Sequence, residues 1–202
     1  MVKIYEWEVS EKMKYRMSYV LGGLFYTETL KIFKVYSEEG NWPATRERVL
    51  SENRLNANMK RSAKRIYQEI ELRLKTLTKE ELTLLERGTA EEKRQLLWLA
   101  CCKSYRFLYE LTSELINEKR LTGETVLACS DYEAFYTQKA MGSEALQNLT
   151  ASTRQKLRSV AFRILREADI LNQRKEILPQ LLTPELEAVI KADDPMLLTI
   201  YP

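Results

Sequence analysis

The sequence predicts an all-α fold: a compact, multi-helix globular domain around one long central helix, with two helix-turn-helix-like units. Three observations lead to this prediction. One stretch of 31 residues carries apolar side chains at helical spacing, three segments match the capping-box pattern, and two basic amphipathic segments each follow a shorter helix. We expect a single domain over residues 1–202, with lobes at 20–75, 76–128 and 129–202.

The long helix is expected over residues 90–120, which contain neither Pro nor Gly. Two adjoining apolar rows run along it, and adjoining rows indicate a helix that is packed from more than one side. The first row comprises Leu97, Cys101, Leu108, Leu111 and Leu115, and the second comprises Trp98, Cys102, Tyr105 and Tyr109. At 1.5 Å per residue this helix would be roughly 46 Å long, so the other helices are expected to pack against it.

Three helices are expected between the glycine pair at 22–23 and residue 75. Residues 1–18 show weak periodicity, and either an early strand or an ordered arm fits them. A helix follows the glycine pair at 22–23 and ends at Gly40, because Gly is a common residue at helix ends. A short helix over about 44–52 has a Pro at its entrance, and a polar turn leads to a third helix over about 57–75.

Three capping boxes, each a hydroxyl residue followed three positions later by a carboxylate, mark further helix starts. The box at Thr78 begins a short helix that Gly88 ends, and the box at Thr89 begins the long helix. The box at Ser130 begins a helix that runs to about Ala140.

The last quarter of the chain alternates short and long elements. One helical turn is expected at Glu144–Asn148, followed by a helix over about 152–168. Two short apolar pieces around a basic turn, within 169–182, fit a small hairpin or wing. A final short helix begins at Thr183, with Pro in its first turn, and Pro195 breaks it.

Composition excludes several classes of protein. Hydrophobic residues make up 45% of the chain and charged residues 30%, as in soluble globular proteins. The longest apolar runs are far shorter than the ~20 residues of a membrane-spanning helix, and the charged amino-terminal residues lack the apolar core of a secretion signal. Three cysteines do not form a disulfide framework. We therefore expect a cytoplasmic protein that does not enter the membrane.

Charge is segregated along the chain although the net charge is only +3. Residues 41–75 carry nine Lys or Arg against four Asp or Glu, and residues 150–175 carry seven against two. Residues 176–202 carry one basic residue and five acidic ones. Segregation of this kind can produce a positive surface on a nearly neutral protein.

The two basic segments share one plan: a short helix, a polar connection and a longer basic helix, which is what a helix-turn-helix requires. On each longer helix the apolar residues occupy one face, and the cations lie opposite or beside it. Arg and Gln suit base edges, whereas Lys and Ser suit phosphates. The candidate DNA-binding residues are Lys60, Arg61, Lys64, Arg65, Arg154, Lys156, Arg158, Arg163 and Arg166.

Two features of these helices have a second interpretation. A surface helix rich in Lys and Arg is also what an ordinary solvated face looks like, so the pattern alone does not establish nucleic-acid binding. Phe162 lies off the apolar stripe of its helix. Either another element packs there, or the ring is presented to a partner.

Two features common in enzyme active sites, histidine and a phosphate-binding glycine motif, are missing. The chain has no His, so it lacks the usual base of nucleophile pairs and the usual zinc ligand. No glycine motif that cradles phosphates is present. Cys101 and Cys102 point about 100° apart on a helix, which favours buried apolar roles. We therefore expect no enzyme activity, no catalytic residues, no metal site and no cofactor.

Six blocks of the sequence carry a resemblance to a known family: SAKRIYQEI (62–70), LLWLACCKSYRFLYE (96–110), DYEAFYTQKA (131–140), STRQKLRSVAFRILREADIL (152–171), LLTPELEAVI (181–190) and the final Ile-Tyr-Pro. In their order and spacing they resemble the BrxA family of bacteriophage-exclusion (BREX) defence systems. The similarity runs from about Gly22 to the end of the chain, and the segment 141–146 is less similar than its flanks.

This resemblance implies a small, all-helical, cytoplasmic component of a phage-defence system whose methyltransferase, ATPase and phosphatase-like proteins are separate chains. It implies double-stranded DNA and other BREX proteins as partners, with helix-turn-helix-like elements and no catalysis. We expect the chain to be a monomer on its own. Two alternatives remain: an adaptor whose basic faces bind acidic protein surfaces, and a helical RNA-binding module in which Phe162 would stack on bases.

Overall fold

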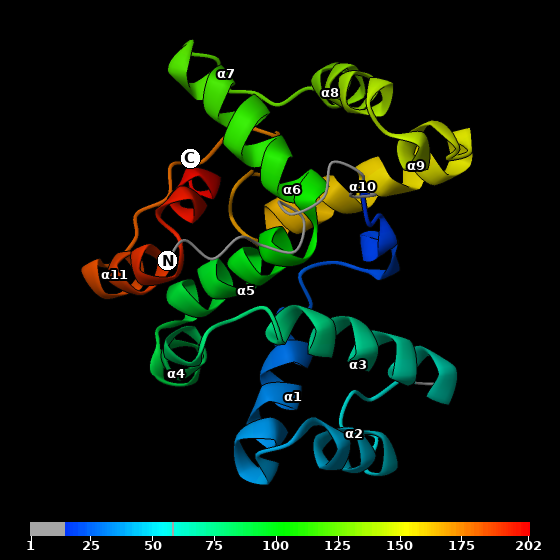
Figure 1. The fold of residues 1–202 in the computed structure, drawn as a ribbon, viewed down its shortest axis with the longest axis vertical. Helices are drawn as coiled ribbons and strands as arrows, with labels where there is room; N and C mark the ends of the chain where they lie inside the picture. Colours follow the sequence, from blue (N-terminus) through cyan, green and yellow to red (C-terminus); the bar gives the residue numbers. More distant parts are fainter. Residues whose placement is uncertain (1–14, 58) are drawn as a thin grey trace.

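The computed structural model describes residues 15–57 and 59–202, and within them the secondary structure is helical, as the sequence predicts (Figure 1). The expected strand or arm at 1–18 lies mostly outside the described residues. The helices are η1 (Ser18–Leu21), α1 (Tyr26–Glu39), α2 (Trp42–Ser51), α3 (Lys60–Leu74), α4 (Lys79–Arg87), α5 (Ala90–Ser104), α6 (Arg106–Glu110), η2 (Leu111–Ile116), α7 (Asn117–Leu121), α8 (Cys129–Met141), α9 (Glu144–Gln147), α10 (Ala151–Glu167), α11 (Pro184–Asp193) and η3 (Pro195–Ile200).

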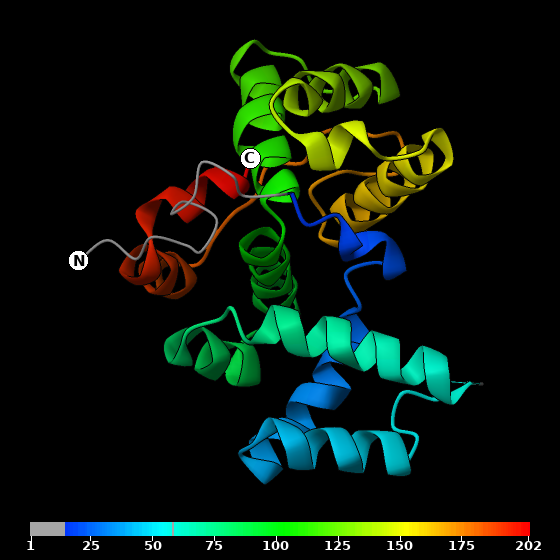
Figure 2. The ribbon, with the colours of Figure 1, turned by 45° about the vertical axis from the view of Figure 1, so that its right-hand side comes forward.

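Helices α1, α2 and α3 form a unit at one end of the molecule, and α3 connects it to the rest by packing across α5 (Figures 1 and 2). The predicted stop at Gly40 is confirmed: this residue has φ 70°, and its N–H donates to the carbonyl of Tyr36. The side chain of Asn41 caps α2 by accepting from the N–H of Ala44 at 2.9 Å. Pro43 lies in the first turn of α2, as expected.

Two of the three predicted capping boxes are present. Thr78 and Glu81 exchange side-chain and backbone hydrogen bonds at the start of α4, and Thr89 and Glu92 do so at the start of α5. The third box, at Ser130, is wrong. Helix α8 begins at Cys129, so its N-cap is Ala128, two residues before Ser130, and the carboxylate of Asp131 accepts from the N–H of Ala128 at 2.8 Å.

The predicted continuous helix over 90–120 is also wrong, because Tyr105 interrupts it with extended backbone angles, φ −133° and ψ 95°. Helix α5 therefore ends at Ser104, and α6, the π-helical η2 and α7 continue in another direction (Figure 1). The ring of Tyr105 packs edge-on against Tyr19, and its hydroxyl donates to the buried carboxylate of Glu69. These contacts to residues distant in sequence override a local sequence that contains no helix breaker.

Helix α5 still forms the centre of the core, since every residue from Gln95 to Lys103 is buried. The indole of Trp98 is fully buried and donates to the carbonyl of Ile200 at 3.0 Å. The hydroxyl of Tyr201 donates to the carbonyl of Gln95 at 2.9 Å. The last turn of the chain is thereby packed onto the central helix.

The segment between α10 and α11 forms a turn with one antiparallel bridge, Leu171 to Ile177, and a second bridge joins Val126 to Glu176. No strand longer than a bridge is formed in the described part of the chain. The predicted helix after it is present as α11, with Thr183 as its N-cap and Pro195 beyond its end. No helix of residues 15–57 and 59–202 is both long and apolar enough to cross a membrane.

Candidate nucleic-acid interface

The first basic surface is the amino-terminal half of α3. The helix buries Ala63, Tyr67, Ile70 and Leu74 against the core, because these positions share one face. Opposite and beside this face the helix carries four exposed cations, none of which forms an ion pair with another described residue. These are Lys60, Arg61, Lys64 and Arg65.

The carboxyl-terminal half of α3 is different, because its cations are neutralised within the fold. Arg73 is buried and its guanidinium pairs with Glu69 at 2.8 Å. Lys75, just after the helix, pairs with Glu71 at 2.5 Å. The excess positive charge that the sequence shows over 41–75 is therefore concentrated in the first two turns of α3.

The second basic surface follows α10, which has no acidic residue before its last position, Glu167. The apolar side of α10 is buried. The hydroxyl of Thr150 caps the start of the helix by accepting from the N–H of Thr153 at 3.2 Å. Three of the predicted cations are exposed and one is half-buried, again without an ion pair among the described residues. The exposed three are Arg154, Lys156 and Arg163, and the half-buried one is Arg166.

Arg158 differs from the other predicted DNA-binding residues, because its guanidinium pairs with a carboxylate of another helix. Its side chain is 28% exposed, and its Nη1 lies 2.5 Å from Oε1 of Glu133 on α8. This ion pair joins α10 to α8 and offsets the charge locally. Of the nine predicted residues, seven are exposed and Arg166 is half-buried, all eight without an ion pair to another described residue, and the ninth, Arg158, forms a contact between helices.

Phe162 is buried, which decides between its two interpretations. The ring lies 6.0 Å from that of Tyr132, and the amine of Lys175 lies 5.6 Å from its centroid. Another element therefore packs on this side of α10, and the ring is not available for stacking on a base.

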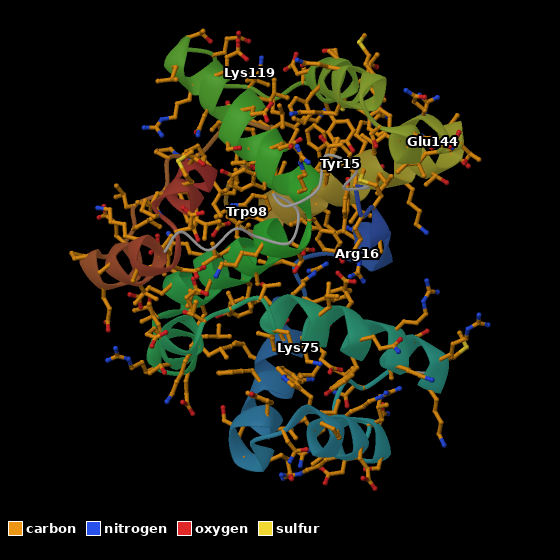
Figure 3. The ribbon with its side chains drawn as sticks, in the orientation of Figure 1. Tyr15, Arg16, Lys75, Trp98, Lys119 and Glu144 are labelled. Carbon is orange, nitrogen blue, oxygen red and sulfur yellow. The ribbon has the colours of Figure 1, made fainter. Side chains whose placement is uncertain are left out.

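The two basic helices lie on the same side of the molecule. In both views their amino ends reach the right-hand edge, with α10 above and α3 below (Figures 1 and 2). Residues 15–25 run between them, and η1 contacts both helices. Figure 3 shows Arg16 in this position, exposed and between the two ribbons. The sequence pattern does not identify Arg16, because no helical periodicity marks it.

The cysteines have the buried roles that the sequence suggests for the adjacent pair. Cys101 and Cys102 are buried, and burial raises the pKa of Cys101 to about 11 even though Arg73 lies nearby and lowers it. A thiol with this pKa stays protonated near neutral pH and is a poor nucleophile. Within the described residues, no group of three or more acidic or thiol side chains is placed to hold a metal ion.

A model of the BrxA protein family matches residues 13–194. The chain belongs to the BrxA family. The match includes α3, α10 and Arg16 and ends before the final Ile-Tyr-Pro. The resemblance that the sequence blocks suggest is thereby confirmed, and the chain is a BrxA component of the BREX antiviral defence systems.

Two proteins named "BREX protein BrxA" are similar in sequence. The one from Bacillus cereus (strain H3081.97) is 30% identical over 130 residues, which cover 64% of this chain and 65% of that protein. The one from Escherichia coli O9:H4 (strain HS) is 26% identical over 175 residues, which cover 85% of this chain and 82% of that protein.

The fold also matches a solved structure, the crystal structure of an uncharacterized protein from Magnetospirillum magneticum. The TM-score is 0.76, and the alignment covers 93% of this chain and 98% of that one. Sequence identity is 17%. At this identity the match establishes the all-α fold and carries no information about function.

Proposed function

We propose that this family member is a non-catalytic DNA-binding component of a BREX system, and that it binds duplex DNA through α3 and α10. The observation that carries the proposal is the placement of their cations. Eight basic side chains from two helices on one side of the molecule have no acidic partner among the described residues. A duplex presents one phosphate charge per ~1.7 Å of its axis, so a surface of this kind gains affinity by releasing counterions.

We further propose that α2–α3 and α8–α10 act as helix-turn-helix-like units, with α3 and α10 as the helices nearest the DNA. An α-helix fits the major groove, which is about 12 Å wide. Ser152 and Gln155 are exposed in the first turns of α10, where a recognition helix usually contacts base edges. The second unit has an inserted short helix, α9, so its connection is longer than a tight turn.

The alternative is an adaptor that uses the same cations to bind acidic surfaces of other BREX proteins. Both functions depend on positive charge, so charge alone does not separate them. RNA binding has less support, because Phe162, the aromatic ring that the sequence offered for stacking, is buried.

Charge reversal tests the proposal. In the first variant, Arg61, Arg65, Arg163 and Arg166 are all replaced by Glu. The matched control reverses Lys79, Arg87, Arg120 and Lys191, which lie on α4, α7 and α11 and give the same change in net charge. Each variant is titrated against duplex DNA, single-stranded DNA and RNA in mobility-shift assays at two salt concentrations. Circular dichroism verifies that both variants fold.

The expected result is that the first variant loses duplex affinity by roughly 100-fold or more, while the control variant binds within a few-fold of wild type. Assembly with other BREX proteins should persist in both. If the first variant binds duplex DNA like wild type but no longer assembles with its partner proteins, the adaptor function is correct and the DNA-binding assignment is wrong.

A further inference from the structure

Residues 15–25 are anchored at both ends to the core that supports the basic helices. The hydroxyl of Tyr15 donates to Glu110 of α6 at 2.5 Å. The fully buried ring of Tyr19 packs edge-on against Tyr105, with a centroid distance of 5.4 Å, and its hydroxyl lies 3.5 Å from that of Tyr132 on α8. The backbone around Arg16 is therefore held in place from two sides.

Two adjacent backbone groups in this segment connect α3 to α10. The carbonyl of Gly23 accepts from Nη1 of Arg73, in the last turn of α3, at 2.9 Å. The N–H of Leu24 donates to Oε2 of Glu167, the last residue of α10, at 2.6 Å. Gly23 permits this close approach, because a Cβ at this position would lie 2.0 Å from Oε2 of Glu167. The carboxyl ends of the two basic helices are thus fixed relative to each other.

Arg16 places a further cation between the two basic surfaces (Figure 3). Its Nε donates to the hydroxyl of Ser18 at 2.9 Å, which directs the side chain without neutralising it. Arg16 is exposed and forms no ion pair with another residue that the structure describes. A planar guanidinium in this position is suited to a phosphate oxygen, since it can donate two parallel hydrogen bonds.

We propose that α3, Arg16 and α10 form one continuous site that holds a single DNA duplex, with Arg16 contacting the phosphate backbone between the two helices. This inference rests on the proposed DNA-binding function. It adds that the helices act together on one molecule and that the segment 15–25 is part of the interface. Two independent sites would instead bind two duplexes per chain.

Replacing Arg16 with Gln tests the contact. The probe is a mixed-sequence duplex of about 30 base pairs, and the control is Arg120→Gln, an exposed arginine on α7. Loss of one phosphate contact should weaken binding roughly three- to tenfold and lower the slope of log affinity against log salt by about one unit. Arg120→Gln should change neither quantity. Equal behaviour of the two variants would overturn the role of Arg16.

Stoichiometry tests the single site. Duplex is titrated at concentrations well above the dissociation constant, and sedimentation counts the duplexes bound per chain. We expect one per chain for wild type, and reduced affinity at that same stoichiometry for both Arg61→Gln/Arg65→Gln and Arg163→Gln/Arg166→Gln. Two duplexes for wild type, with each double variant retaining one at full affinity, would disprove the single site while leaving DNA binding itself intact. A wild-type chain that binds no duplex would disprove the proposed function instead.

Discussion

Lys103 is a charged side chain with no exposed surface, held in the core by two carboxylates. Its amine lies 2.6 Å from Glu81 of α4 and 2.7 Å from Asp193 of α11. It also donates to the carbonyl of Thr76 at 3.3 Å. Burial raises the pKa of Glu81 although the charge of Lys103 and its hydrogen bonds lower it. This cluster holds α4, α5 and α11 together without any exposed charge.

Replacing Lys103 with Met should lower the free energy of unfolding by about 3–5 kcal/mol, because it leaves two buried carboxylates without their cation. The control is Lys191→Met, which removes a surface ion pair with Glu187 and should cost less than about 1 kcal/mol. Urea denaturation of both variants measures the difference. Equal losses would mean that the buried cluster contributes no more than a surface pair.

Individual arginines show which residues of the candidate nucleic-acid interface can be predicted from the sequence. The exposure of Arg61, Arg65 and Arg163 follows from helical periodicity, because a helix with one apolar stripe must turn its other side to solvent. Arg73 and Arg158 carry the same charge but pair with carboxylates in the fold. The partner of Arg158 lies 25 residues away on another helix, which no local pattern reveals.

At the scale of elements, helix ends were predictable where local chemistry fixes them. Thr78 and Thr89 form their capping boxes with residues three positions away, so the sequence contains both partners. The interruption at Tyr105 was not predictable, because its hydroxyl reaches Glu69, 36 residues earlier in the chain. The sequence therefore indicates the starts of α4 and α5, but neither the start of α8 nor the change of direction after α5.

Two glycines at helix ends offer a matched test of backbone conformation. Gly40 ends α1 with φ 70°, whereas Gly142 ends α8 with φ −100°. A Cβ at either position would have no neighbour within 4 Å. Gly40→Ala should therefore destabilise the protein by about 1–2 kcal/mol through the left-handed backbone alone.

Gly142→Ala should be neutral or stabilise by up to about 1 kcal/mol, because Ala adopts this conformation without strain and restricts the unfolded chain. Thermal and urea unfolding of the two variants give the comparison. A Gly40→Ala protein as stable as Gly142→Ala would show that the left-handed turn is not what ends α1.

At the scale of the whole molecule, the charge pattern of the sequence becomes a one-sided surface only through folding. Helices α3 (Lys60–Leu74) and α10 (Ala151–Glu167) are far apart in the sequence, and their amino ends reach the same edge because η1 packs between them (Figures 1 and 2). The sequence predicted both basic faces but not their common orientation, and it did not predict Arg16 between them. These features depend on the contacts of residues 15–25.

The most direct test of the DNA-binding surface is the salt dependence of duplex affinity, measured for wild type and for the variant Arg61→Gln/Arg65→Gln/Arg163→Gln/Arg166→Gln between about 50 and 200 mM salt. If these four arginines contact phosphates, wild-type affinity falls steeply, and the variant lowers the log–log slope by about 3–4 units, since each contact contributes about 0.9. An unchanged slope in the variant, or a wild-type affinity that barely responds to salt, would contradict the proposed DNA-binding surface.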